Sequence, residues 1–357
     1  MHYLDNAATT RVLPEAAEAA VHAMLEEFGN PSSLHRMGLE ASHLLEDSRK
    51  TVASALGCLP EEVYFTACGT ESTNISLHGA AHLNRHKKGR IIVTEIEHAA
   101  TINTARQLAD SGFDVVFLAP DATGHITPEA LSEALTEDTV LLSCQLVNNE
   151  IGTVQPVEAL GRLLKAKAPK ALFHIDAVQG LCRVRLTPKK WNCDLMSVSG
   201  HKIGAPKGIG ALYVKKGVHI PPFMLGGGQE KGFRSGTESV PLICGFGAAV
   251  KKLAPNVSAN FEKAADIQAY LIEKCNENGD VFVNSRKGGS PYVTSIAVNG
   301  LKSEVLLHYL EKREIYVSSG SACSKGKKSS VLKEFRYPEQ SLDSTIRISF
   351  SIDTTKA

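Results

Sequence analysis

Short runs of β-branched and aromatic residues alternate with helical patterns between residues 60 and 215, and this alternation limits the fold more than any other feature. Seven runs predict strands, at residues 63–67, 90–96, 114–120, 139–147, 172–178, 194–199 and 210–215. Several are continuously apolar, as strands covered on both faces are. The segments 99–110 and 157–168 carry apolar positions three and four apart, which predicts crossover helices. We therefore expect an α/β domain built on a parallel sheet.

The pattern changes after the glycine-rich segment 225–237. Two helical stretches reach about residue 278. Beyond them, strands are expected at VFVN (281–284), VTSIAVN (293–299), IYVSSG (315–320) and STIRISFS (344–351), and a helix at SEVLLHYLEKR (303–313). This set predicts a smaller α+β domain with a boundary near Asn256.

The composition is that of a globular protein whose charges nearly balance. The 357 residues carry a formal net charge of +1, with 43% apolar and 22% charged residues. The length fits about two domains, and the balanced charge predicts no general attraction to nucleic acid or to an anionic membrane. Because no uncharged apolar stretch approaches ~18 residues and MHYLDNAATT is unlike a signal peptide, we expect a cytoplasmic protein.

Eight cysteines are spread along the chain, and none of them forms a CxxC pair. A cytoplasmic protein of this length keeps its thiols reduced, so we expect no disulfide framework. A structural zinc site needs ligands at paired spacing, and for this reason no metal is predicted.

Polar residues follow several predicted strands, at the edge where parallel sheets bind ligands. Gly69 and Thr70 come after residues 63–67 and open a helix whose free backbone N–H groups would suit a phosphate. Thr70 could instead be an ordinary helix N-cap. His98 follows residues 90–96 at the start of a helix, where a cap or surface role competes with a catalytic one.

Asp176 emerges from the apolar run LFHIDAV, and Gln179 follows it three residues later. A carboxylate that leaves a buried strand needs a cationic or N–H partner. A salt bridge or a helix cap would satisfy it as well as a ligand would, so this pair alone leaves the two roles open.

Lys202 lies just after the predicted strand DLMSVS, beside Ser199 and His201. Desolvation at the end of a buried strand lowers the pKa of an amine, which favours Schiff-base formation. A solvated turn lysine is the alternative. The hydroxyl of Ser199 and the imidazole of His201 could reach the same phosphate as Thr70.

Together these strand ends supply the groups that hold pyridoxal 5'-phosphate, and this is the cofactor that we predict. Asp176 would keep the pyridine nitrogen protonated, and Gln179 would bond the ring hydroxyl. His98 would cover one face of the ring, and Lys202 would carry the cofactor. The set is far more specific than any of its members.

Cys323 lies in the segment SSGSACSKGKKSS (318–330), whose Ser and Gly content predicts an exposed, mobile loop. Lysines follow at 325, 327 and 328, and nearby cations favour a thiolate. Cys323 therefore has the surroundings of a nucleophile, and a core cysteine fits this segment poorly. The lysines could equally be a solvated face. The segment is no P-loop, because its glycines are one residue too far apart and Lys328 follows the GK pair.

Arg347 alternates with apolar residues in STIRISFS, and it needs an anionic partner or a solvent-facing side. A two-pronged contact with a substrate carboxylate would satisfy it, and a solvent-facing arginine on an edge strand is the alternative. Asn149 follows the predicted strand 139–147 and could merely cap a turn.

Motifs along nearly the whole chain resemble those of cysteine desulfurases of the NifS/IscS type, within the class V aminotransferase group of fold-type I pyridoxal phosphate enzymes. SGHK with GFRSGTE is typical of the group, and SSGSAC is typical of desulfurases with a long mobile loop. Further matching segments are YLDNAATT (3–10), GNPSSLHRMG (29–38), ACGTESTN (67–74), TEIEHAA (94–100), VNNEIGTVQP (147–156) and HIDAVQ (174–179). The resemblance implies a mostly parallel seven-stranded sheet in a large domain of residues 15–255, and a small α+β domain of residues 1–14 and 256–357.

The resemblance also implies roles for single residues. Lys202 would form the Schiff base, and Cys323 would form a persulfide. Phosphate contacts are implied for Thr70, Ser199 and His201, and ring contacts for His98, Asp176 and Gln179. Thr237 matches a phosphate contact made from a neighbouring subunit, which implies a homodimer, and Asn149 and Arg347 match positions that hold substrate or cofactor.

The implied activity converts L-cysteine to L-alanine and passes sulfur through Cys323 to acceptor proteins that serve iron–sulfur cluster, thio-cofactor or tRNA synthesis. A selenocysteine lyase or a class V aminotransferase would use Lys202 in the same way, and an inactive scaffold protein is a third alternative. Chains of the family usually continue past the strand of Arg347 into a closing helix, and the segment after Cys323 is more basic here than in many of them. Both differences bear on acceptor docking.

Overall fold

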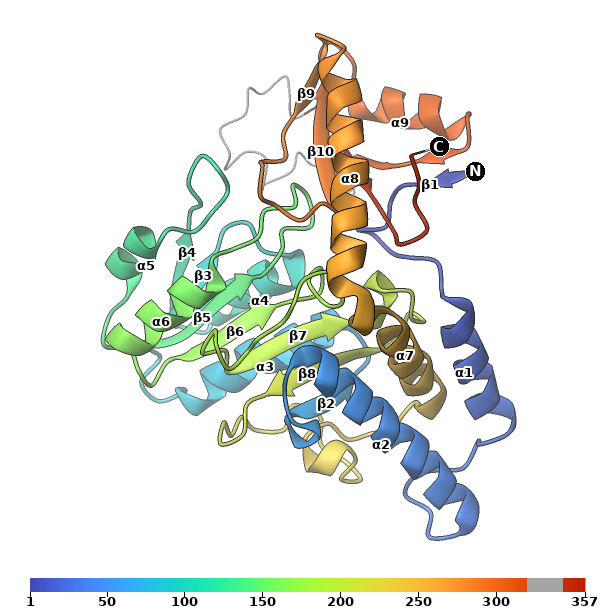
Figure 1. Cartoon of the computed structure of the whole chain (residues 1–357). Coiled ribbons are helices and arrows are strands. Elements are labelled where there is room, and N and C mark those ends of the chain that lie inside the picture. The colour runs from blue at the N-terminus through green and yellow to red at the C-terminus, as the bar shows by residue number, and fades with distance from the viewer. Residues whose placement is uncertain (320–342, 357) are drawn as a thin grey trace.

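The computed structural model describes residues 1–319 and 343–356. Its centre is a seven-stranded sheet of order β2-β8-β7-β6-β5-β3-β4, with helices on both faces (Figure 1). The seven predicted strands are confirmed, each somewhat shorter than its apolar run. They are β2 (Val63–Thr66), β3 (Arg90–Thr94), β4 (Asp114–Leu118), β5 (Thr139–Gln145), β6 (Leu172–Asp176), β7 (Leu195–Ser199) and β8 (Gly210–Val214).

Strand β8 runs antiparallel to both of its neighbours, β2 and β7, whereas the other pairs in this sheet are parallel. Residues 200–209 alone connect β7 to β8, and this is too short for the crossover that a parallel neighbour needs. The apolar run at 210–215 carries no sign of this reversal. The carboxyl ends of β2, β3, β5, β6 and β7 therefore share one edge of the sheet.

Successive side chains of a strand point to opposite faces of the sheet, and helices cover both faces. In β3, Ile91 and Val93 pack with α3 (Gly69–Leu83) and α4 (Ala99–Asp110). Ile92 belongs to the core on the other face, which includes side chains of α2 (Arg36–Leu56), α6 (Val157–Lys167) and α7 (Val240–Leu253). Helices α4 and α6 confirm the two expected crossover helices.

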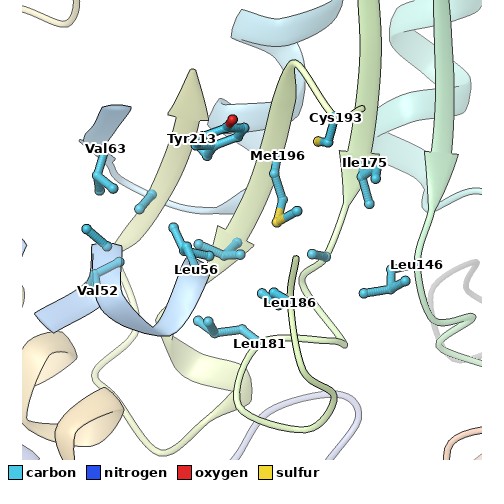
Figure 2. Packing of buried hydrophobic residues seen from close by; sticks show 14 of the residues in the cluster. Val52, Leu56, Val63, Leu146, Ile175, Leu181, Leu186, Cys193, Met196 and Tyr213 are labelled. Carbon is cyan, nitrogen blue, oxygen red and sulfur yellow. The ribbon is translucent and has the colours of Figure 1, made fainter. Parts of the chain in front are cut away.

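The larger core lies between the large sheet and the helices α2, α6 and α7. Figure 2 shows Leu56 of α2 near Val63 of β2, with Met196 and Tyr213 on the adjoining strands β7 and β8. All four side chains are fully buried. Apolar burial contributes roughly 25 cal/mol per Å², so this cluster holds the strands, and with them the polar strand ends, in fixed positions.

The large sheet has further helices around it. Helix α1 (Pro14–Leu25) packs on α7, and α5 (Pro128–Ala134) packs on α6. Short 3₁₀ helices are η1 (Pro60–Glu62), η2 (Gly200–Lys202), η3 (Glu230–Gly232) and η4 (Ala254–Asn256). Within the described residues, none of the helices combines the length and the apolar character needed to cross a bilayer.

A second, antiparallel sheet has the order β12-β13-β10-β9. In a separate two-stranded sheet, β1 (His2–Tyr3) pairs in parallel with β11 (Ile315–Tyr316), so the N-terminal strand lies beside this part of the molecule (Figure 1). The other elements are α8 (Val257–Asn276), β9 (Val281–Val283), β10 (Val293–Val298), α9 (Ser303–Glu311), β12 (Ser318–Ser319) and β13 (Thr345–Ser349). The division into domains of residues 15–255 and of residues 1–14 with 256–357 stays a prediction.

The N-terminal segment links the four-stranded sheet to the seven-stranded sheet. Asn6 Nδ2 donates to the carbonyl oxygen of Ser349 in β13 (2.9 Å). The backbone N–H of Thr10 donates to the carbonyl oxygen of His201, just after β7 (2.9 Å). The backbone between these anchors crosses the carboxyl edge of the large sheet, where it forms one wall of a cavity.

Candidate active site

A cavity of about 330 Å³ lies between the carboxyl edge of the large sheet and the N-terminal segment. Predicted site residues from six separate stretches of the chain line it: Gly69, Thr70, His98, Asn149, Asp176, Gln179, Ser199, His201, Lys202 and Arg347. Thr237 is exposed and does not line this cavity. Cys323 lies outside the described residues, so its role stays a prediction.

The N-terminus of α3 forms one end of the cavity. Its N-cap residue is Cys68, so Thr70 lies within the first turn, and the N-cap alternative for Thr70 is wrong. Among the described residues, no side chain of the N-cap position bonds this turn, which leaves its N–H groups available. A Cβ at Gly69 would come within 2.6 Å of Val178 Cγ2, so the close packing here requires glycine.

Ser199 ends β7 beside this helix. A Cβ built at Gly69 would lie 3.5 Å from the Cβ of Ser199. The Ser199 Oγ is buried and has no hydrogen-bond partner among the described residues. Because a buried hydroxyl without a hydrogen bond raises the free energy of the folded protein, we expect a ligand to provide the missing partner. An unsatisfied hydroxyl beside a helix N-terminus suits an anion such as phosphate.

His201 borders the same end of the cavity. Its Nδ1 lies 3.2 Å from Thr9 Oγ1. Burial, together with the positive charges of Lys202 and Lys207, lowers the pKa of His201 to about 4. The ring is therefore neutral at physiological pH, and it can still donate one hydrogen bond to an anion.

Asp176 lies at the end of β6, and its Oδ1 accepts a hydrogen bond from the backbone N–H of Val178 (2.9 Å). Burial raises the pKa of the Asp176 carboxyl, and this hydrogen bond and the positive charge of Lys202 oppose the rise. A cationic ring N–H placed beside this carboxyl would restore its ionised form.

Gln179 is held at both ends of its amide group. Its Nε2 donates to the carbonyl oxygen of Ala7 (2.9 Å), and its Oε1 accepts from Arg183 Nη1 (2.6 Å). The amide therefore has a fixed orientation at the cavity wall. Arg183 was not among the residues that the sequence singled out.

Lys202 is the last residue of the short helix η2, which directly follows β7. Its Nζ donates to the carbonyl oxygens of Ala7 and Ala8, each at 2.7 Å. The alternative of a freely solvated turn lysine is therefore wrong. Lys202 and Asp176 line the same cavity.

His98 combines two of the roles considered for it. It is the N-cap of α4, where its Nδ1 accepts a hydrogen bond from the backbone N–H of Ala100 (3.1 Å). It also lines the cavity. A neutral ring that accepts at Nδ1 carries its proton at Nε2, so the cap interaction settles which nitrogen can donate.

Arg347 is buried on β13, an inner strand of the small sheet, so the alternative of a solvent-facing edge arginine is wrong. Its Nη2 donates to Asp5 Oδ1 (2.8 Å), and its Nη1 donates to the carbonyl oxygen of Asn149 (3.0 Å). Its Nε is buried without a partner among the described residues. Asp5 was not predicted as a site residue, although it stands in the motif YLDNAATT.

Glu97 is a third residue that sequence reasoning missed. Its Oε1 accepts from Thr94 Oγ1 (2.6 Å) and from the backbone N–H of Gln145 (2.6 Å), and it thus ties the end of β3 to the end of β5. Burial is the largest cause that raises the pKa of Glu97 to about 8. The available signal was a carboxylate next to His98, directly after an apolar strand.

We predict that Glu97→Gln makes stability less sensitive to pH. The folded-state pKa of Glu97 is raised from 4.5 to about 8, so the unfolded chain releases this proton first, and wild-type stability falls as pH rises through that range. Glutamine keeps the shape and the acceptor but does not titrate. Between these two pKa values, the free energy of unfolding of the variant should therefore rise relative to that of the wild type by on the order of 1 kcal/mol per pH unit. Urea unfolding at several pH values measures this gain.

The exposed residue Glu133 offers a matched control. Glu133→Gln is expected to leave the pH profile of the wild type unchanged. If Glu97→Gln and the wild type lost stability in parallel between acid and mildly alkaline pH, Glu97 would be ionised in the folded protein and the assignment would be wrong.

Known proteins resemble this chain over almost its full length. A model of the class-V aminotransferase family matches residues 2–357. The chain is 39% identical to a cysteine desulfurase of Trichormus azollae (99% of this chain and 89% of the relative covered) and 40% identical to the cysteine desulfurase IscS of Methanosarcina thermophila (97% and 86%). The X-ray structure of a NifS-like protein from Rickettsia africae matches with a TM-score of 0.89 at 33% identity, covering 100% of this chain and 95% of that one. The chain thus belongs to the class-V aminotransferase family and, within it, to the cysteine desulfurases.

Proposed function

We propose that this protein converts L-cysteine into L-alanine with pyridoxal 5'-phosphate as its cofactor, and that Cys323 receives the sulfur as a persulfide. The observation that carries the proposal is the cavity of about 330 Å³, which combines an anion site, a buried carboxyl and a lysine amine. Family membership supports the same reaction, because relatives at 39% and 40% identity are named cysteine desulfurases.

The cavity residues suit the phosphate, the ring nitrogen and the ring hydroxyl of the cofactor. The first turn of α3, the unpaired hydroxyl of Ser199 and the neutral ring of His201 would hold the phosphate. Asp176 would hold a proton on the ring nitrogen, and Gln179 would contact the ring hydroxyl. When bound, the cofactor supplies a positively charged ring that takes up the electron pair released at the substrate Cα.

Lys202 and Arg347 would act on the substrate. The amine of Lys202 would remove the Cα proton as a general base and later return a proton to the product. Arg347 would bind the substrate carboxylate through its unpaired Nε, while Asp5 and the carbonyl oxygen of Asn149 hold the rest of the guanidinium group.

Cys323 would perform the sulfur transfer. Its thiolate would attack the sulfur atom of the bound cysteine, so that an S–S bond forms while the substrate C–S bond breaks. Cys323 becomes a persulfide, and the electron pair of the broken bond stays on the carbon, which takes up a proton to give alanine. A thiolate on an acceptor protein would then take the outer sulfur by the same exchange.

We also propose that two copies of the chain form the working enzyme. Large apolar side chains are exposed along α1 and the connection to α2, among them Val21, Met24, Leu25, Phe28 and Leu34. Exposed apolar surface of this kind marks an interface, and a second copy could cover it and add its Thr237 to the phosphate site. Sedimentation equilibrium should give the mass of two chains, whereas an active monomer would contradict the proposal.

The test of the reaction is an assay of the purified, cofactor-loaded protein. With L-cysteine we expect equal amounts of alanine and of transferable sulfur. Turnover of L-selenocysteine alone would identify a selenocysteine lyase instead. Amino-group transfer to an α-keto acid without sulfur release would identify an aminotransferase.

A further inference from the structure

Arg183 is a buried cation that contacts two residues of the candidate active site, the side chain of Gln179 and the backbone of Lys202. Its side chain forms its hydrogen bonds with neutral oxygens: Nη1 donates to Gln179 Oε1 (2.6 Å), and Nη2 donates to the carbonyl oxygens of Lys202 (2.9 Å) and Asn6 (3.3 Å). The guanidinium carbon lies 5.3 Å from the ring centroid of Tyr292. Among the described residues, no carboxylate forms an ion pair with Arg183.

Arg49 is a second buried arginine, and it differs from Arg183 in having a carboxylate partner. It is as deeply buried as Arg183, but its two Nη atoms each donate to a carboxylate oxygen of Glu230 at 2.8 Å. The charge of Arg49 is thus neutralised within the protein. Burial of an unneutralised cation such as Arg183 is costly, and this cost calls for an anion nearby in the working enzyme.

The contact with Arg183 decides which way the Gln179 amide faces. A guanidinium group has only donors, so it must meet the amide oxygen and never the amide nitrogen. The nitrogen is therefore turned to the side of Ala7 and the cavity that Gln179 lines. One of its two N–H groups donates to the carbonyl oxygen of Ala7, and the other has no acceptor among the described residues, so it can donate to a ligand.

We propose that Arg183 is a positioning residue that makes Gln179 an obligatory donor and, through it, directs positive charge at the ring hydroxyl oxygen of the cofactor. This inference rests on the proposed function. The oxygen is thereby stabilised in its ionised form, and it serves as the anion that Arg183 lacks. The hydrogen bond from Arg183 to the Lys202 carbonyl oxygen fixes the backbone of the attachment lysine relative to the same oxygen.

The inference is tested by the pH at which the visible absorption of the cofactor-loaded protein changes. A nearby cation makes a group bind its proton less tightly, so removing the cation raises the midpoint. We expect Arg183→Met to raise the midpoint by about one pH unit. Arg183→Lys keeps the charge, and it should return the midpoint most of the way to the wild-type value.

The double variant Arg49→Met/Glu230→Gln is the matched control. It also removes a buried guanidinium group, but neither residue lines the cavity. We expect a lower unfolding temperature with an unchanged midpoint. A shift of equal size in this control would mean that the midpoint reports general loosening of the protein, which would overturn the inference.

Gln179→Glu provides a second route if Arg183→Met does not fold. Its carboxylate would neutralise Arg183 in place and would remove the donor, so the midpoint should rise at least as far. An unchanged midpoint in either variant would overturn the role of Arg183. Wild-type protein that gains no visible absorption with the cofactor would instead contradict the proposed function itself.

Discussion

Lys202→Ala is expected to abolish most alanine formation from cysteine, with a loss of up to about 10⁴-fold in turnover. Lys202 is the one lysine of the described residues that lines the cavity, and the carbonyl oxygens of Ala7 and Ala8 hold its amine in place at 2.7 Å. Among the described residues, no second lysine that could take over proton removal at the substrate Cα lines the cavity. Steady-state assays of alanine, together with the visible spectrum of the loaded protein, measure the effect.

Lys216→Ala is the control for this variant. Lys216 is exposed, its Nζ lies 3.8 Å from Glu61 Oε1, and it does not line the cavity. Its replacement should leave turnover within experimental error of the wild type. Alanine formation by Lys202→Ala at even a tenth of the wild-type rate would show that another group removes the proton.

Cys323→Ser is expected to leave cofactor binding intact and to stop sulfur transfer, with a loss of at least about a thousandfold. The hydroxyl of serine stays protonated at neutral pH, and it cannot form the S–S bond on which the transfer depends. Absorption spectra of the loaded variant report cofactor binding. Release of sulfide under reducing conditions reports the transfer step.

Cys58→Ser serves as the matched control. Burial is the largest cause that raises the pKa of the Cys58 thiol to about 12, and its Sγ lies 3.6 Å from the carbonyl oxygen of Ala53. This thiol cannot act as a thiolate at neutral pH, so its loss should leave sulfur transfer unchanged. Normal sulfide release by Cys323→Ser would mean that another cysteine accepts the sulfur.

The strands and the residues at their ends could be predicted because both depend on local sequence. Asp176, Ser199 and Lys202 each follow an apolar run that ends abruptly in polar residues. Parallel strands bring such ends to one edge of a sheet, so their meeting in one cavity followed from the fold class. The reversal of β8 could not be predicted from its own residues, because the length of the connection from β7 determines it.

The contacts that support the site could not be predicted, because they join distant parts of the chain. Asp5 and Arg347 lie 342 positions apart, and only the folded structure brings them to 2.8 Å. The raised pKa of Glu97 and the unneutralised charge of Arg183 are properties of their surroundings and leave no pattern in the sequence. The roles of Thr237 and Cys323 stay predictions.

The most direct test of the account is to identify the lysine that carries the cofactor. The loaded protein is treated with borohydride, which makes the link to the lysine permanent, and its peptides are then analysed by mass spectrometry. We predict that the cofactor mass appears on the peptide that contains Lys202. Modification of a different lysine, or a protein that carries no cofactor mass after loading, would contradict the central claim.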